Sequence, residues 1–151
     1  MDRGVFPVFL LYQSFRLFPL LTVAENVMYP MELRGMKPRD ARTRAAELTA
    51  RVGLPDTALD RYPTMLSGGE QQRVAIARAL GMDTKILLAD EPTGNLDTAN
   101  SDNIFRILQQ LAHEEGYCVI VVTHDMALAA KADRVLELRD GAVVSGGEDT
   151  Q

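Results

Sequence analysis

Residues 66–80 read LSGGEQQRVAIARAL, and shortly afterwards residues 86–91 read ILLADE. Ser67 followed three positions later by Glu70 is a capping box, which predicts a helix that begins at Ser67 and continues to about Gly81. Four mainly apolar residues before two acids predict a strand that ends in carboxylates. A helix followed directly by such a strand is typical of an α/β protein.

The segments on either side extend this alternation. Residues 8–12 predict a short buried strand, and the β-branched run 119–122 predicts a strand buried on both faces. The Asp-Gly pair at 140–141 predicts a hairpin that joins residues 135–138 to 142–144. Residues 13–21 are expected to form a loop, and helices are expected over about 22–34, 38–52, 100–115 and 125–131. The order predicts an α/β sheet with helices inserted between its first and second strands.

Size and charge narrow the choice of function. A chain of 151 residues is expected to form one domain. Its net charge of -5 gives no support for binding a nucleic-acid backbone. The basic residues between Arg34 and Arg51 are expected to be a solvated helix face. The single cysteine, Cys118, is expected to be a small apolar side chain in a buried strand rather than a nucleophile.

Two interpretations of the segment from Ser67 to Glu70 stay open on the residues alone. One is the capping box. The other is an anion site, because Gly68 and Gly69 are poor helix formers and allow the backbone at a helix N-terminus to come close to a phosphate.

Three further segments carry polar groups suited to chemistry. Asp90 and Glu91 follow an apolar strand, so one carboxylate can hold Mg²⁺ through water and the other can orient an attacking water. Asp97 follows a Pro/Gly turn and is expected to cap the next helix. His124 lies just past a strand, where a lone histidine is usually structural, and His113 is expected on the protein surface.

Residues 66–80 over their whole length, together with residues 86–91, resemble the signature motif and Walker B strand of ATP-binding cassette (ABC) ATPases. The resemblance implies a single incomplete P-loop NTPase domain of the RecA-like type, with a mostly parallel sheet and an inserted helical subdomain. It places the helical subdomain at about 22–81, the RecA-like part at about 5–21 and 82–144, and a loose tail at 145–151.

The resemblance also implies site roles, residue by residue. Asp90 is similar to the Walker B aspartate that holds Mg²⁺ largely through water, Glu91 to the catalytic glutamate, and His124 to the switch histidine. Gln13 is similar to the glutamine that reaches Mg²⁺ and the attacking water, and Asp97 falls in a segment that resembles the D-loop at the dimer interface. The ATP held by the opposite subunit is expected to contact Ser67, Gly68, Gly69 and Glu70.

One expected motif is missing from the sequence. No G-x-x-x-x-G-K-[ST] phosphate loop occurs, and none of the three lysines, Lys37, Lys85 and Lys131, follows a glycine. The chain is therefore expected to be a truncated domain that matches the C-terminal two-thirds of a cassette. Without the phosphate-loop strand, we expect unpaired strand edges and a rearranged or domain-swapped sheet. We also expect negligible ATP hydrolysis by the chain alone.

The function that the resemblance implies is the ATP-binding subunit of an ABC transporter, most similar to the macrolide-export and lipoprotein-release group. Its expected cofactors are ATP and Mg²⁺. Its expected partners are a membrane-spanning subunit and a second nucleotide-binding subunit, without nucleic acid, at the cytoplasmic face of the cell membrane. A non-catalytic dimerisation or docking module is the alternative. A DNA-repair type of ABC ATPase is less favoured, because the chain lacks sustained heptads and is acidic.

Overall fold

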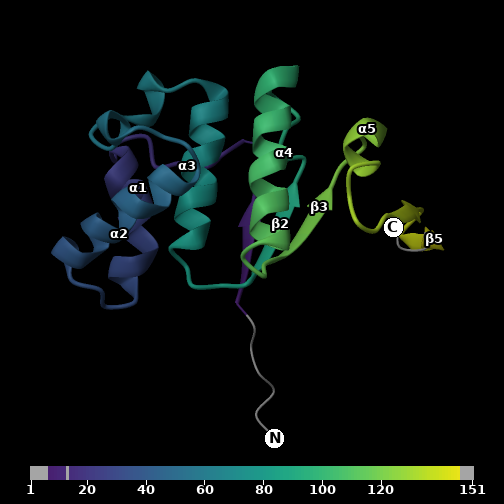
Figure 1. Cartoon of the computed structure of the whole chain (residues 1–151), viewed down its shortest axis with the longest axis horizontal. Coiled ribbons are helices and arrows are strands. Elements are labelled where there is room, and N and C mark those ends of the chain that lie inside the picture. The colour runs from purple at the N-terminus through teal and green to yellow at the C-terminus, as the bar shows by residue number, and fades with distance from the viewer. Residues whose placement is uncertain (1–6, 13, 147–151) are drawn as a thin grey trace, which may run out of the picture.

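The computed structural model describes residues 7–12 and 14–146, and Figure 1 shows three regions along its longest axis. Helices α1–α3 form a bundle at one end, a small sheet with helix α4 occupies the middle, and a β-hairpin lies at the other end. The predicted helical insertion is confirmed, because the bundle falls in the sequence between strands β1 and β2. The candidate site lies at the carboxyl ends of the second and third strands of the chain.

The bundle follows the sequence signals closely. Capping boxes begin α1 (Val23–Leu33) at Thr22 and α3 (Gly68–Leu80) at Ser67, while Pro38 begins α2 (Pro38–Arg51). Two 3₁₀ turns, η1 (Asp56–Ala58) and η2 (Pro63–Met65), connect α2 to α3. The three helices bury one apolar face each against a shared core that includes Val27, Leu48 and Ile76.

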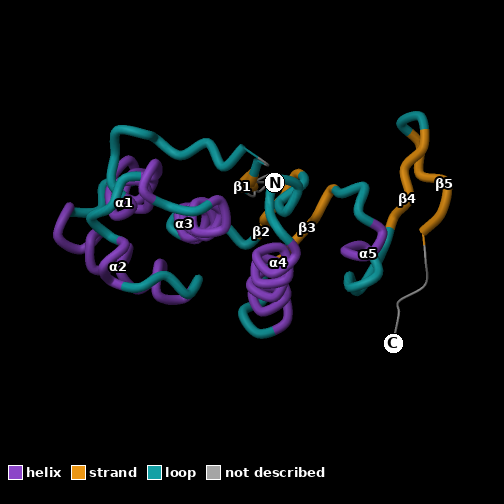
Figure 2. The backbone as a smooth tube through the Cα atoms, turned by 90° about the horizontal axis from the view of Figure 1, so that it is seen from above, coloured by secondary structure: helices purple, strands orange, loops and turns teal. Residues whose placement is uncertain are grey.

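Strands β1 (Val8–Leu11), β2 (Ile86–Asp90) and β3 (Cys118–Val122) form a parallel sheet in the order β1-β2-β3. Helix α4 (Thr98–His113) connects β2 to β3 and lies on one face of the sheet (Figure 2). It begins two residues before the predicted start because the Asp97 carboxylate accepts the Asn100 N–H at 2.8 Å, which confirms Asp97 as the cap.

The prediction that β3 is buried on both faces is wrong. Alternate residues of β3 are exposed, with Ile120 and Val122 each 48% accessible, and Cys118 is exposed as well. The cause is one-sided cover: α4 packs on the face that carries Val119 and Val121, and no helix of the described chain lies on the other face (Figure 2). Apolar composition alone predicted burial that the packing of the described residues does not supply.

The predicted hairpin is confirmed as β4 (Leu136–Arg139) paired antiparallel with β5 (Ala142–Gly146), preceded by the short helix α5 (Met126–Ala129). Because β5 includes residues 145–146, the predicted loose tail begins too early, and residues 147–151 lie outside the described residues. The hairpin is a sheet of its own, so the described strands form two separate sheets instead of one rearranged sheet. Swapping between chains stays a prediction.

Among the described residues, we find no helix that combines the length and the apolar character needed to cross a bilayer.

Candidate functional site

The candidate site lies at the carboxyl ends of β2 and β3, where the parallel register sets Asp90 opposite Val122. The next residue, Glu91, donates its backbone N–H to the Val122 carbonyl oxygen at 2.8 Å. Its φ of +45° puts a non-glycine residue in the left-handed region, which costs energy and is found mainly where surrounding contacts impose it. This turn directs the Glu91 side chain toward the segment that follows β3.

Three groups from that segment hold the Glu91 carboxylate. The Thr123 hydroxyl donates to Oε2 at 3.1 Å, and the His124 backbone N–H donates to Oε1 at 2.9 Å. The His124 ring atom Nδ1 lies 2.6 Å from Oε1. Desolvation by itself raises the pKa of Glu91, but the hydrogen bonds from His124 and Thr123 outweigh it and keep the pKa below its ordinary value of 4.5. Glu91 is therefore an ionised acceptor at neutral pH.

The His124 ring extends from this contact into solvent, with 89% of its side chain exposed against 21% for Glu91. An ionised carboxylate can only accept a hydrogen bond, so Nδ1 carries the shared hydrogen. The structure thus brings together Glu91 and His124, which the sequence indicated as separate candidates. His113 is exposed, as predicted, and its Nε2 lies 2.8 Å from a carboxylate oxygen of Asp133 on the surface.

Asp90 has the chemistry of a magnesium ligand. Its carboxylate is exposed at the end of β2, on the sheet face opposite α4, and carries hard oxygen donors. No group of three or more His, Cys, Asp or Glu side chains within the described residues could hold a metal alone. The described residues would therefore fit Mg²⁺ only as part of a shared ligand set, in which Asp90 would supply carboxylate oxygens and the other ligands would come from elsewhere.

The start of α3 shows the capping box in full. Glu70 donates its N–H to Ser67 Oγ at 3.3 Å, and the Ser67 N–H donates to the Glu70 carboxylate at 2.8 Å. Ser67 itself is exposed at the helix N-terminus. Because its Oγ acts as the acceptor in this cap, the hydroxyl hydrogen stays available to donate to an anion.

The two glycines after Ser67 are explained in part by packing. A Cβ on Gly69 would lie 2.6 Å from Cγ of Asn100, at the start of α4, and closer still to its Oδ1. A Cβ on Gly68 would lie 3.3 Å from Cδ2 of Leu96, the end of a flexible side chain. The absence of side chains thus lets α3 approach the 96–100 segment, a contact that neither interpretation from the sequence anticipated.

Gln13 lies outside the described residues, but the loop that follows it is held from two sides. Arg78 of α3 donates to the carbonyl oxygens of Arg16 at 2.9 Å and Phe15 at 3.3 Å. Desolvation lowers the pKa of the Arg78 guanidinium. Asn26 of α1 is fully buried and both accepts the Phe18 N–H and donates to three carbonyl oxygens of residues 18–22.

Sequence reasoning missed Thr123, Arg78 and Asn26. Thr123 stands directly before His124, so the polar run at the end of β3 was a usable signal for it. Arg78 carried none, because its partners are backbone carbonyls of a loop that is distant in sequence. Asn26 lies close in sequence to its partners, the carbonyls of Phe18, Leu21 and Thr22, but it stands inside a helix with no pattern that marks it as a loop contact.

Comparisons with known proteins give a consistent answer. The sequence model of the family described as "ABC transporter" matches residues 7–94. The chain is 51% identical over 133 residues to the lipoprotein-releasing system ATP-binding protein LolD of Ruegeria sp. (strain TM1040), covering 88% of this chain and 58% of that protein. It is 47% identical over 134 residues to the macrolide export ATP-binding/permease protein MacB of Syntrophobacter fumaroxidans, covering 87% and 19%.

Solved structures agree with the sequence relatives. The ATP-binding cassette MJ0796, in a dimeric post-hydrolysis state bound to ADP and Pi, matches with a TM-score of 0.82 and 39% identity, over 95% of this chain and 63% of that one. A second dimeric structure of MJ0796, described as a bacterial ABC transporter cassette, matches with a TM-score of 0.81 and 41% identity. The chain thus spans less than two thirds of these relatives.

The contact between Gly69 and Asn100 predicts an asymmetric response to alanine. Gly69→Ala should lower the free energy of unfolding by about 1–3 kcal/mol, because the added methyl group overpacks a buried contact. Gly68→Ala is the matched control and should be neutral or slightly stabilising, because Leu96 can move and alanine is the better helix former. Urea denaturation measures both, and equal losses would contradict the packing explanation.

The lowered pKa of Glu91 predicts a specific acid sensitivity. A carboxyl group whose pKa is lower in the folded chain contributes stability that is fully present above its unfolded value of 4.5 and is lost as the pH falls through the folded value. Glu91→Gln should therefore flatten the fall in unfolding free energy below pH 4.5, and Thr123→Val should flatten it partly. Identical acid slopes for wild type and Glu91→Gln would show that these hydrogen bonds do not act on the carboxylate.

Proposed function

Since this chain belongs to the ABC transporter family, we propose that it is the ATP-binding and ATP-hydrolysing part of a transporter. In this proposal, nucleotide-dependent dimerisation of two such parts powers movement of a substrate across a membrane. The division into a helical subdomain at about 22–81 and a RecA-like part at about 5–21 and 82–144 belongs to the same proposal. Its similarity to LolD and MacB favours a transporter of the lipoprotein-release or macrolide-export type.

The observation that carries the proposal is the contact between Glu91 and His124. It places an ionised carboxylate beside an exposed imidazole at the carboxyl edge of a parallel sheet, the edge at which α/β proteins bind ligands. Asp90 lies at the same strand end. These three side chains combine a metal-binding oxygen, a proton acceptor and a hydrogen-bonding ring within one small region.

Each residue then has a distinct proposed role. Glu91 accepts a hydrogen bond from the attacking water and orients it, a task suited to a carboxylate that stays ionised. His124 holds the Glu91 carboxylate through Nδ1, and its exposed ring is available to a phosphate. Mg²⁺, when bound through Asp90, would neutralise charge on the phosphates of ATP. Gln13 is proposed as a further contact to Mg²⁺ and the water, and Asp97 as part of the dimer interface.

The start of α3 is proposed to serve a different ATP molecule, held by the opposite subunit. Ser67 is exposed there with a hydroxyl hydrogen free to donate, and the helix N-terminus favours negative charge. The close approach of Gly69 to Asn100 does not oppose this role, because it occurs on the side of α3 that faces α4. Ser67, Gly68, Gly69 and Glu70 together form this proposed contact.

An exposed apolar surface supports docking on a membrane-spanning subunit. The Phe18 and Tyr29 rings lie 4.8 Å apart between centroids, and both are exposed. Leu20, on the same loop as Phe18, and Leu33, on the same helix as Tyr29, are 86% and 71% exposed. Apolar side chains that gather at the surface mark interaction sites. The chain is accordingly proposed to lie at the cytoplasmic face of the cell membrane. There it would bind its membrane-spanning partner without entering the bilayer.

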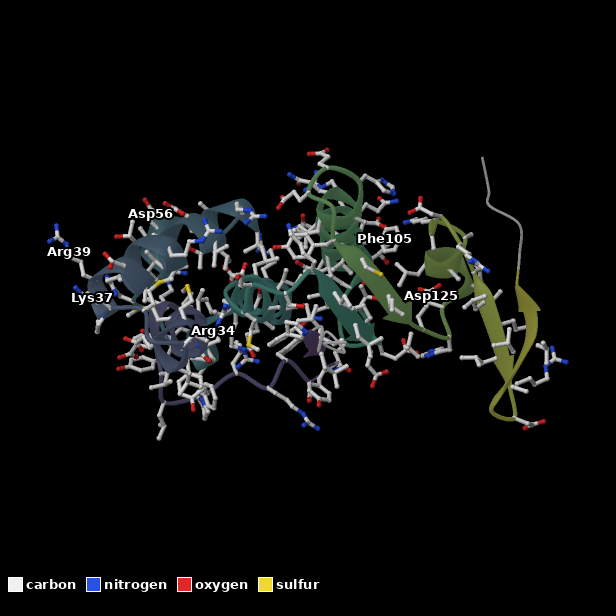
Figure 3. The ribbon with its side chains drawn as sticks, turned by 90° about the horizontal axis from the view of Figure 1, so that it is seen from below. Arg34, Lys37, Arg39, Asp56, Phe105 and Asp125 are labelled. Carbon is white, nitrogen blue, oxygen red and sulfur yellow. The ribbon has the colours of Figure 1, made fainter. Side chains whose placement is uncertain are left out.

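Nucleic acid is not among the proposed partners. The basic residues Lys37 and Arg39 stand at the outer end of the helical bundle, far from Asp125 beyond β3 (Figure 3). Three arginines of the same region are neutralised by ion pairs with acidic side chains, at Arg34–Asp83, Arg42–Asp60 and Arg44–Glu47. The net charge of -5 likewise gives no support for binding a phosphate backbone.

A polypeptide of these 151 residues contains no G-x-x-x-x-G-K-[ST] segment, and this favours a second candidate function. In that case the chain binds or dimerises without turnover of its own. We propose negligible hydrolysis by this polypeptide alone, because backbone N–H groups and a lysine must hold the β- and γ-phosphates during the reaction. Its exposed Ser67 remains able to complete a site on another subunit.

We therefore predict that this chain is inactive alone but complements a partner subunit that lacks its own signature serine. The 151-residue chain alone should show no Mg-ATP turnover above background. Added to a complete family member whose own signature serine is replaced by alanine, it should raise turnover, because Ser67 supplies the missing donor. A coupled phosphate-release assay measures both reactions.

The matched controls are Ser67→Ala, which should not restore turnover, and Thr43→Ala, which removes an exposed hydroxyl from α2 and should behave as wild type. Turnover by the chain alone that disappears in Glu91→Gln would overturn the proposal of an inactive polypeptide. Equal restoration by Ser67→Ala and wild type would overturn the proposed role of the α3 start.

A further inference from the structure

The turn that carries Glu91 needs external support. Its φ of +45° is unfavourable for a residue with a side chain. Two backbone hydrogen bonds hold the turn, from the Glu91 N–H to the Val122 oxygen at 2.8 Å and from the Gly94 N–H to the Glu91 oxygen at 3.1 Å. Neither bond involves the next peptide carbonyl, that of Pro92, which is part of the same turn and is buried.

Gln72 of α3 provides the contact to that carbonyl. Its side chain is fully buried, and its Nε2 donates to the Pro92 oxygen at 2.8 Å across 20 positions of sequence. Pro92 has no N–H and its ring restricts φ. Its carbonyl oxygen is therefore the backbone group of Pro92 through which a hydrogen bond can hold this part of the turn. The hydrogen bond therefore joins α3 directly to the residue after Glu91.

The oxygen of the Gln72 side-chain amide indicates why its Nε2 donor is needed. Gln72 Oε1 is buried without a hydrogen-bond partner among the described residues. Leaving an acceptor unpaired in the interior is unfavourable, so an apolar side chain of similar volume would be the better core residue. A glutamine at this position is best explained by the need for its N–H at Pro92.

We propose that Gln72 is a positioning residue, which fixes the Glu91 carboxylate on Thr123 and His124 by holding the Pro92 carbonyl. The inference rests on the proposed catalytic role of Glu91 and deepens it. Gln72 stands five residues after Ser67 on α3, about 7.5 Å along the helix axis. One rigid helix therefore connects the proposed contact to the opposite subunit's ATP with the turn that aims Glu91.

A simple structural role makes a different prediction from a positioning role. If Gln72 only fills the core, replacing it changes the stability of the whole domain and leaves the Glu91 turn as it is whenever the chain is folded. If Gln72 positions the turn, the change is local, and it appears at Glu91 and His124 while the strands keep their protection.

The test is Gln72→Met in the 151-residue chain, which keeps the volume of the side chain and removes the donor. Native-state amide hydrogen exchange should become about five- to tenfold faster at Glu91 and His124, the size expected for one lost hydrogen bond. The amides of β2 before Asp90 should exchange at the wild-type rate.

The matched control is Gln71→Met, the neighbouring glutamine whose Nε2 donates to the Leu66 oxygen at 3.2 Å, and it should leave Glu91 unchanged. Gln72→Leu serves as a second variant if the methionine variant does not fold. Unchanged exchange at Glu91 and His124, or a uniform acceleration over the whole chain, would overturn the proposal. The exchange measurement does not use ATP, so a failure of the proposed function leaves this test intact.

Discussion

The parallel register between β2 and β3 is the constraint on which the site depends. Because Asp90 pairs with Val122, the residues that follow the two strands lie next to each other. Glu91 therefore makes four hydrogen-bond contacts, with Val122, Thr123 and His124. A slip of one residue would turn alternate side chains to the other face of the sheet and separate these groups. Burial of Leu87 and Ala89 against α4 makes such a slip costly, so the core of the sheet also sets the chemistry at its edge.

Local sequence signals predicted most elements because their causes are local. Thr22 and Ser67 each begin a helix through a capping box, Pro38 begins another, and Asp140 and Gly141 form the hairpin turn. Glu91 and His124 were each predicted just past an apolar strand, and parallel strands end at one edge of a sheet, which is why the structure brings the two residues together.

The features that sequence reasoning missed depend on tertiary packing. Whether β3 is covered on one face or two is decided by where α4 lies, and the composition of residues 118–122 cannot distinguish these cases. The sequence indicated that Gly69 belongs to a phosphate site or to a simple cap, whereas the structure shows it packed against Asn100 of another helix, 31 positions later. The left-handed backbone of Glu91 and its support by Gln72 had no sequence signal, since neither residue type favours that role.

A through-hydrogen-bond NMR coupling in the nucleotide-free chain tests most directly whether the sheet positions Glu91. We expect a coupling between the Glu91 amide nitrogen and the Val122 carbonyl carbon, since that hydrogen bond requires both the register and the turn. The bond from the Cys118 N–H to the Lys85 oxygen, 2.8 Å long at the opposite end of the same strand pair, provides an internal reference. A visible reference coupling with none between Glu91 and Val122 would contradict the claim that the sheet itself positions the carboxylate.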